Sequence, residues 1–390
     1  MLNGKKVVLG VSSSVAIYKA LELVRALKKQ GADVHVVMTP HASQLISPQL
    51  FQAVSGNKVW VELFNREGKD AMPHVGVLSD VDVVLLAPAT ASLIGRYAMG
   101  LASDLLTTFL LATKAPVVVA PAMNTNMFEH PIVQENLKKL KEFGVHVVEP
   151  IEGELACGIY GAGHLADLET IVLYVIRAVT IQDLKGKRVL ISCGGTEELI
   201  DPVRILTNRS SGRMGLMFAI ASFVRGADVV VISGRVSIEY PSVFDVISIR
   251  STLELKDMLE AHFDEADVFV SAAAVSDYRP LKSSSIKLKK DGRDRSLKLT
   301  ENPDVLKDLM ARKRKDQMVI GFALEDGDLV KRGFEKLVRK GVDLLIANSV
   351  DVLGKEAGEF ILFDGREHHS LRMTKAILSQ HVLDSVVKGF

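Results

Sequence analysis

The sequence predicts an α/β protein made of two doubly wound (Rossmann-like) domains with mainly parallel sheets. Apolar, β-branched runs alternate with helical stretches along the whole chain, which is the order expected when helices cover parallel strands. The opening pattern occurs twice: GKKV at 4–7 returns as GKRV at 186–189, and GADV at 31–34 returns as GADV at 226–229. At 390 residues the chain is also longer than one hydrophobic core usually supports.

The first domain is expected to span residues 1–180. Its first strand, at 7–10, leads into a helix on which Ala20, Leu23, Val24 and Leu27 share one face, and Gly31 ends that helix. Further buried strands are expected at 34–38, 83–87, 117–120 and 145–148.

The second domain is expected to span residues 185–390, with the boundary at 180–185 after a helical run. Its repeated tetrapeptides lie 40 residues apart, against 27 in the first domain, so about 13 extra residues follow its first strand. Doubly wound folds place ligand-binding loops at such strand ends. Further strands are expected at 229–232, 268–272, 318–322 and 344–347, and the polar stretch 277–300 is either a β-ribbon or a mobile flap.

Composition excludes several classes of function. With 48 basic and 47 acidic residues the net charge is +1, which gives no electrostatic case for a nucleic-acid or membrane-surface protein. No apolar run is long enough to span a bilayer and the start lacks a signal-peptide pattern, so a cytoplasmic protein is expected. Only two cysteines are present, which excludes a disulfide framework and a cysteine-rich metal site.

The first domain carries four candidate site features. The turn GVSSS at 10–14 suits a phosphate, although its serines suit a helix N-cap equally well; it is not GxGxxG, so an adenine dinucleotide is not indicated. His74 is either catalytic or structural. Asn124 follows a strand, where its amide could donate to a carboxylate or simply form a turn. Cys157 lies among glycines and is the better reactive thiol, whereas Cys193 ends a strand and is expected in the core.

The motifs GVSSSVAIYK, PHVGVLSDVDVVLLAPATA, GLASDLLTT, PAMNTNM and GELACGIYGAG, in this order, resemble the flavin-containing cysteine decarboxylases of coenzyme A synthesis. The resemblance implies a flavodoxin-like flavoprotein domain that binds FMN. It further implies that Asn124 holds the substrate carboxylate, His74 assists proton transfer and Cys157 protonates the ene-thiol product. The FMN-binding residues implied are Ser12 and Ser13 at the phosphate, with Thr39, Ala87, Thr90, Ser103 and Met123 around the rest of the cofactor.

In the second domain the inserted region ends in NRSSGR at 208–213, where a helix is expected to begin. Ser210, Ser211 and Gly212 at a helix start, with arginines on both sides, favour phosphate binding over a merely capped helix. Asp277 follows small residues after a strand and could accept hydrogen bonds from sugar hydroxyls. The stretch after it contains Lys287, Lys289 and Lys290, and composition alone does not identify which of them matters.

The motifs IDPVR and NRSSG, with AAAVSDY, SIKLKK, NPDVL, GFALE and LLIANSV, resemble the phosphopantothenate–cysteine ligases. The resemblance implies that CTP and Mg²⁺ are used, that Lys287 contacts the triphosphate and that Asn208 stabilises an acyl-nucleotide. No metal ligands are identified. The residues implied to frame the nucleotide are Ser271, Ala272, Ala273, Asp277, Pro303, Asp304, Val305, Leu306, Phe322, Lys336 and Lys340.

Together the two resemblances imply consecutive reactions on one chain, a ligation of cysteine to 4′-phosphopantothenate followed by a decarboxylation to 4′-phosphopantetheine. They also imply a homo-oligomer with trimers of the flavin domain and dimers of the ligase domain. A peptidyl-cysteine decarboxylase or a flavin prenyltransferase would share the first domain only. A flavin-binding regulatory subunit would not need a reactive thiol.

Overall fold

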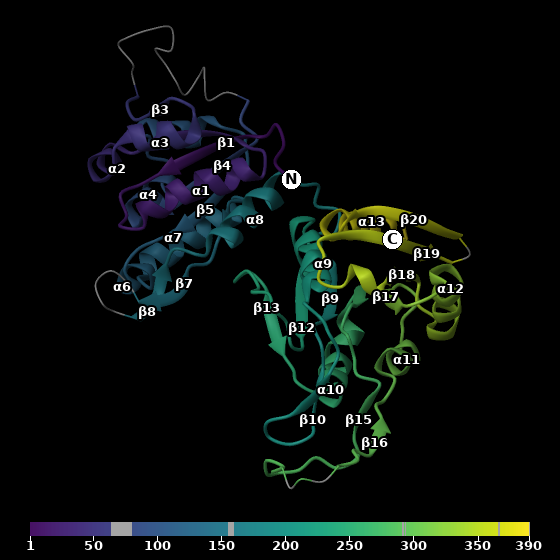
Figure 1. The fold of residues 1–390 in the computed structure, drawn as a ribbon. Helices are drawn as coiled ribbons and strands as arrows, with labels where there is room; N and C mark the ends of the chain where they lie inside the picture. Colours follow the sequence, from purple (N-terminus) through teal and green to yellow (C-terminus); the bar gives the residue numbers. More distant parts are fainter. Residues whose placement is uncertain (64–79, 155–159, 291, 293, 366, 390) are drawn as a thin grey trace. The chain divides into compact units, whose positions relative to one another are not determined.

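The computed structural model describes residues 1–63, 80–154, 160–290, 292, 294–365 and 367–389. The chain forms two compact units, one of Met1–Ile181 with Pro241–Val243 and the other of Gln182–Tyr240 with Phe244–Phe390 (Figure 1). Within the described ranges, no helix combines the length and apolar character needed to cross a membrane.

The first unit is built on a parallel sheet of six strands in the order β3-β2-β1-β4-β5-β6. Sequence periodicity predicted five of these strands, and the short β3 was not expected. The sequence order reverses between β1 and β4, so the carboxyl ends of these two strands open a crevice for ligands. The strands are β1 Lys6–Val11, β2 Asp33–Met38, β3 Val59–Trp60, β4 Val83–Ala89, β5 Val117–Pro121 and β6 His146–Val147.

Helices cover this sheet. Residues of α4, α5 and α7 join the strands in one apolar cluster, while α1 packs against α3 and α8. The predicted face of α1 is buried, with Ala20, Leu23, Val24 and Leu27 fully enclosed. The helices are α1 Ile17–Lys29, α2 Pro40–Leu45, α3 Pro48–Ser55, α4 Ala91–Ala98, α5 Leu105–Ala112, α6 Thr125–Phe128, α7 Pro131–Glu142 and α8 Leu168–Val179; an antiparallel pair, β7 Ile151–Glu154 and β8 Tyr160–His164, completes the unit.

The second unit contains a sheet of eight strands in the order β13-β12-β9-β14-β17-β18-β19-β20. Six strands are parallel, and the β19–β20 hairpin continues the sheet in antiparallel fashion. This hairpin was not predicted. The strands are β9 Arg188–Cys193, β12 Asp228–Ser233, β13 Asp245–Ser248, β14 Val268–Ser271, β17 Met318–Glu325, β18 Leu344–Ser349, β19 Ala357–Asp364 and β20 Glu367–Thr374.

Two helical layers surround the second sheet. Residues of α10, α11 and α12 form one apolar cluster with the strands, and α9 packs against α13. Cys193 is 1% exposed, which confirms that it belongs to the core. A Cβ on Gly215 of α9 would lie 2.2 Å from the Cβ of Cys193, so only glycine allows this helix to approach β9 so closely. The helices are α9 Arg213–Val224, α10 Thr252–His262, α11 Val305–Met310, α12 Leu329–Lys340 and α13 Lys375–Gly389, with 3₁₀ turns at Phe263–Glu265 and Val350–Val352.

The inserted region after β9 is an antiparallel hairpin of β10 Glu197–Leu199 and β11 Ile205–Thr207. The polar stretch at 277–300 begins and ends in a two-stranded ribbon of β15 Tyr278–Pro280 and β16 Leu299–Glu301. The prediction of a β-ribbon therefore holds at the base of the stretch. Figure 1 shows β10 and β15 next to each other at one end of the second unit, where their residues are in contact.

Candidate functional site

The first unit gathers hydroxyl and amide side chains where neighbouring parallel strands end. Ser12 follows β1, Thr39 follows β2, Thr90 follows β4 and Asn124 lies just beyond β5. Because these four strands are adjacent in the sheet, the side chains line one edge that includes the crevice between β1 and β4.

Ser12 connects the two sides of this crevice. Its buried hydroxyl donates to the carbonyl oxygen of Pro88 at 2.7 Å and accepts from the main-chain N–H of Thr90 at 3.0 Å. α1 has Ala16 at its N-cap and no side-chain cap, while the Ser14 hydroxyl accepts the Ala16 N–H at 3.3 Å in the turn that leads into the helix. Ser13, next in the chain, is exposed.

Thr39, Thr90 and Asn124 each begin a helix at this edge. Thr39 and Thr90 accept from the third residue beyond, and Asn124 Oδ1 accepts from Asn126 N–H at 2.9 Å. Asn124 therefore caps α6 through its side-chain oxygen. The role expected for it, donation to a substrate carboxylate, would use the NH₂ group of the same side chain.

The strand β8 passes directly over the segment that holds Asn124. Met123 N–H donates to the Gly163 carbonyl at 3.0 Å, and a Cβ on Gly163, whose φ is +121°, would lie 2.4 Å from the Met123 oxygen. The next residue, His164, shares a hydrogen bond of 2.8 Å with the Lys19 amine.

The other predicted residues of the first unit are less closely associated with this edge. Ala87 lies within β4 and is fully buried. Ser103 is exposed in the loop between α4 and α5, where the Arg96 guanidinium donates to its hydroxyl at 2.8 Å. His74 and Cys157 lie outside the described residues.

In the second unit a cavity of about 470 Å³ opens at the carboxyl ends of β14 and β17. Its size lies within the range of small-molecule sites. Of the residues predicted to frame a nucleotide, Ala272 alone does not line it. Those that do are Ser271, Ala273, Asp277, Pro303, Asp304, Val305, Leu306, Phe322, Lys336 and Lys340.

Two lysines of α12, Lys336 and Lys340, line the cavity together with the carboxylates of Asp277, Glu301 and Asp304. Lys340 forms an ion pair with Asp304. Burial would raise the pKa of Asp304, but the hydrogen bonds from Lys340 and from the Lys307 N–H, together with the positive charges of Lys340 and Arg339, lower it. Burial lowers the pKa of Lys336, and Glu325 opposes this shift while Lys340 and Arg339 add to it. An anion bound here would favour the charged form of Lys336 and so raise its pKa.

Asn208 and Lys287 lie outside the cavity lining. Asn208 directly follows β11, and its amide donates to the carbonyl oxygen of Val275, a lining residue, at 2.9 Å. Lys287 is exposed in the polar stretch between β15 and β16. Beyond Asn208, Gly212 is the left-handed N-cap of α9, and the hydroxyls of Ser210 and Ser211 each accept a main-chain N–H of this turn at 3.4 Å.

Sequence reasoning missed a polar network that begins in the cavity lining, at Asn302 and Ser276. The Asn302 amide donates to the Ser276 carbonyl at 2.8 Å and to the Thr252 hydroxyl at 3.2 Å. Thr252 donates in turn to the buried carboxylate of Glu198 at 2.6 Å. The one available signal was Asn302 immediately before Pro303, in a segment that the motif NPDVL already marked.

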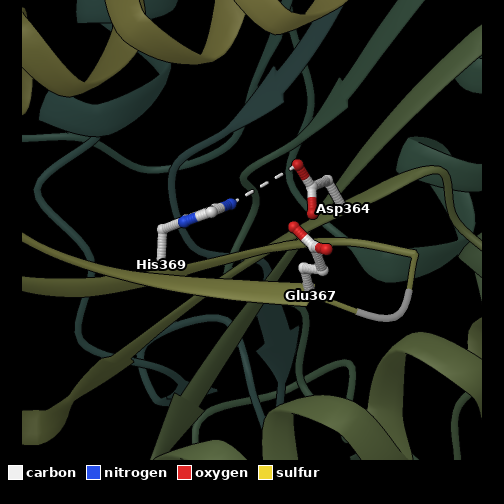
Figure 2. Close-up of side chains that lie close together, drawn as sticks. All are labelled: Asp364, Glu367 and His369. Carbon is white, nitrogen blue, oxygen red and sulfur yellow. Dashed lines mark ion pairs between the residues drawn. The ribbon is translucent and has the colours of Figure 1, made fainter.

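A third group of polar side chains lies at the turn between β19 and β20 of the second unit, outside the cavity lining. Asp364, Glu367 and His369 bring their ligand atoms within 4.8 Å of one another, and His369 lies 3.8 Å from Asp364 (Figure 2). All three are exposed, and exposed acidic groups are common without a metal. We therefore assign no metal to them.

The two sites fit the groups that the sequence implied. The first offers hydroxyls, an amide and main-chain groups at a strand edge, suited to the phosphate and polyol chain of a flavin nucleotide. The second offers lysines for a triphosphate, Asp277 for a sugar and an aromatic ring, Phe322, within one cavity.

Comparison with known proteins assigns the two parts of the chain to two families. Residues 1–180 match the family model described as Flavoprotein, and residues 184–390 match the DNA/pantothenate metabolism flavoprotein C-terminal domain. The "Coenzyme A biosynthesis bifunctional protein CoaBC" of Vibrio vulnificus is 39% identical over 99% of this chain and 98% of its own length. Proteins of the same name from Bacillus subtilis and Escherichia coli are each 40% identical, over 86% and 87% of this chain and 84% of their own lengths.

Proposed function

The chain belongs to the family of coenzyme A biosynthesis bifunctional proteins, and we propose from this premise how its two units divide the work. Residues 1–180 form an FMN-dependent phosphopantothenoylcysteine decarboxylase, and residues 185–390 form a CTP-dependent phosphopantothenate–cysteine ligase. The observation that carries the proposal is that both units match their families over nearly their full lengths within one chain.

Ligation occurs in the second unit. The carboxylate of 4′-phosphopantothenate attacks the α-phosphate of CTP and expels pyrophosphate, and the amine of cysteine then displaces CMP from the acyl-cytidylate. Lys287, Lys336 and Lys340 hold the triphosphate, which brings Mg²⁺ with it. Asp277 accepts from the ribose hydroxyls, and Asn208 donates to the acyl-cytidylate. Support comes from the cavity, which brings Asp277 and both lysines of α12 together.

Decarboxylation occurs in the first unit. FMN supplies a reversible two-electron oxidation of the cysteine moiety, which gives the electrons of the departing carboxylate an acceptor. Ser12, Ser13, Thr39 and Thr90 hold the cofactor at the strand edge, and the Asn124 amide orients the substrate carboxylate. The remaining roles, proton transfer by His74 and protonation of the product by Cys157, are taken from the family resemblance.

We also propose a cytoplasmic homo-oligomer with trimers of the flavin unit and dimers of the ligase unit, on the family resemblance alone. Mass photometry of the full chain tests the assembly. A species whose mass is a multiple of both three and two chains is expected, and a monomer at micromolar concentration would exclude it.

One reaction mixture tests the chemistry. The purified protein is incubated with 4′-phosphopantothenate and cysteine, together with CTP, ATP, GTP or UTP in turn, and the products are followed by mass spectrometry. CTP is expected to give CMP, pyrophosphate and 4′-phosphopantetheine. Release of AMP in preference to CMP would contradict the nucleotide assignment, and accumulation of 4′-phosphopantothenoylcysteine without its decarboxylation would contradict the assignment of the first unit. A mixture without cysteine is the control and should yield no pantetheine product.

A further inference from the structure

The tip of the β10–β11 hairpin carries a carboxylate that is buried although the tip itself lies at the surface. The side chain of Asp201 is 0% exposed, whereas Pro202, Val203 and Arg204 beside it are exposed. Asp201 Oδ1 accepts the main-chain N–H groups of Val203 and Arg204, each at 2.8 Å. Aspartate often closes a turn in this way, and that role accounts for only one of the two carboxylate oxygens.

The second oxygen reaches a distant part of the chain. Asp201 Oδ2 accepts from the Arg204 guanidinium and, at 3.2 Å, from the main-chain N–H of Leu288, which lies 87 residues later in the sequence. The same guanidinium donates to the Leu288 carbonyl oxygen at 3.0 Å. The Asp201–Arg204 pair thus holds both main-chain polar groups of Leu288.

A further main-chain bond fastens the same segment to the hairpin. The N–H of Ser284 donates to the carbonyl oxygen of Ile200 at 2.9 Å, so residues 284–288 are attached at both ends. No helix or strand includes these residues, and therefore the hairpin tip supplies the order that regular structure would otherwise give.

This attachment fixes the main chain next to Lys287. A lysine side chain has four rotatable bonds and loses conformational freedom when it binds a ligand. Fixing its main chain beforehand reduces the entropic cost of placing its amine. The same hairpin ends at Thr207, directly before Asn208. The β10–β11 hairpin is therefore bonded to the segment of Lys287 and ends directly before Asn208, the two residues assigned to ligation that lie outside the cavity lining.

We propose that Asp201 is a positioning residue for ligation, which holds Leu288 through Oδ2 and Arg204 and so sets the reach of Lys287 toward the nucleotide. This inference rests on the role proposed above for Lys287. Burial by itself would raise the pKa of Asp201, but the hydrogen bonds from Val203, Arg204 and Leu288 lower it to about 2. The carboxylate therefore stays ionised at every pH at which the ligase would be assayed.

Asp201→Asn distinguishes the roles of the two carboxylate oxygens, because it keeps one oxygen and replaces the other by NH₂. Its amide oxygen can keep the turn bonds to Val203 and Arg204, whereas its NH₂ group cannot accept from Leu288 or from a guanidinium. Loss of a charge-assisted hydrogen bond predicts about a tenfold or greater fall in kcat/KM for ligation. Trypsin should also cleave the full-length protein faster after the lysines at 282–290. Asp245→Asn, at an exposed position in β13, is the matched control and should change neither.

Arg204→Met tests the same contact from a half-exposed side chain, in case Asp201→Asn does not fold. It removes the donor to the Leu288 carbonyl, and the same loss of ligation and of protection from trypsin is expected. Retained decarboxylation shows in each case that the rest of the chain is intact.

The decisive measurement combines the change with Lys287→Gln. If Asp201 acts through Lys287, Asp201→Asn should lower ligation much less in the Lys287→Gln background than in the wild type. Equal effects in both backgrounds, or wild-type ligation by Asp201→Asn, would overturn the positioning role while leaving the proposed function intact. A wild-type rate for Lys287→Gln would instead refute the role of Lys287, and the inference would fall with it.

Discussion

The two neighbouring serines of the first turn should respond differently to the same substitution. Ser12→Ala removes a buried hydroxyl that accepts the Thr90 N–H and donates to Pro88, while the main-chain N–H of Ser12 still donates to the Pro88 carbonyl at 3.3 Å. The Thr90 N–H is therefore the group left without its partner. An unpaired buried N–H costs about 1 to 3 kcal/mol. Ser13 is exposed, and Ser13→Ala should leave the free energy of unfolding within about 0.5 kcal/mol of the wild type.

The assay is thermal unfolding of the FMN-free protein, followed separately from flavin binding. For a unit of this size each kcal/mol lowers the Tm by about 2 to 4 °C, so Ser12→Ala should lower the first unit's Tm by about 4 to 8 °C if the cost is about 2 kcal/mol. Both variants should bind FMN more weakly in a fluorescence titration. Equal Tm values for the two FMN-free variants would refute the structural role of Ser12. Unchanged FMN affinity in both would refute the placement of the phosphate at this turn.

Three further predictions concern the chemistry. Cys157→Ser should halt after loss of carbon dioxide, so mass spectrometry should detect the oxidised, decarboxylated product in place of 4′-phosphopantetheine; undiminished pantetheine formation would refute its role. Lys287→Gln should lower ligation at least about tenfold and spare decarboxylation of supplied 4′-phosphopantothenoylcysteine, and equal loss of both would argue against separate sites. Because burial lowers the pKa of Lys336, CTP binding should take up a proton at alkaline pH, and CTP affinity should fall as the pH rises through this lowered pKa toward 10.5. Calorimetry in buffers of different ionisation enthalpy should detect this uptake in the wild type and not in Lys336→Met.

The sequence predicted the central strands because both faces of these strands are covered. In β4 and β9, for example, apolar residues run almost without interruption, as buried parallel strands require. The β20 strand, EHHSLRMT, lies at the edge of its sheet with most side chains exposed, so its composition carries no apolar signal. The β10 and β11 strands have three residues each, too few for a period of two to be recognised.

The site residues differ in the same way: some are predicted from their place along the chain, and others depend on contacts between distant segments. Asp277 and the small residues before it follow β14 and were predicted from that position, whereas Lys336, Lys340 and the other predicted lining residues came only from the family resemblance. Asp201 was visible only as one letter of IDPVR, and its partner Leu288 as one apolar residue among lysines. Neither position shows in sequence that a carboxylate at a hairpin tip will hold a main chain 87 residues away. A motif residue such as Asp201 can therefore act by holding the main chain beside a residue that binds the substrate, here Lys287. Asp201→Asn removes that main-chain contact and so distinguishes this role from direct participation in the chemistry.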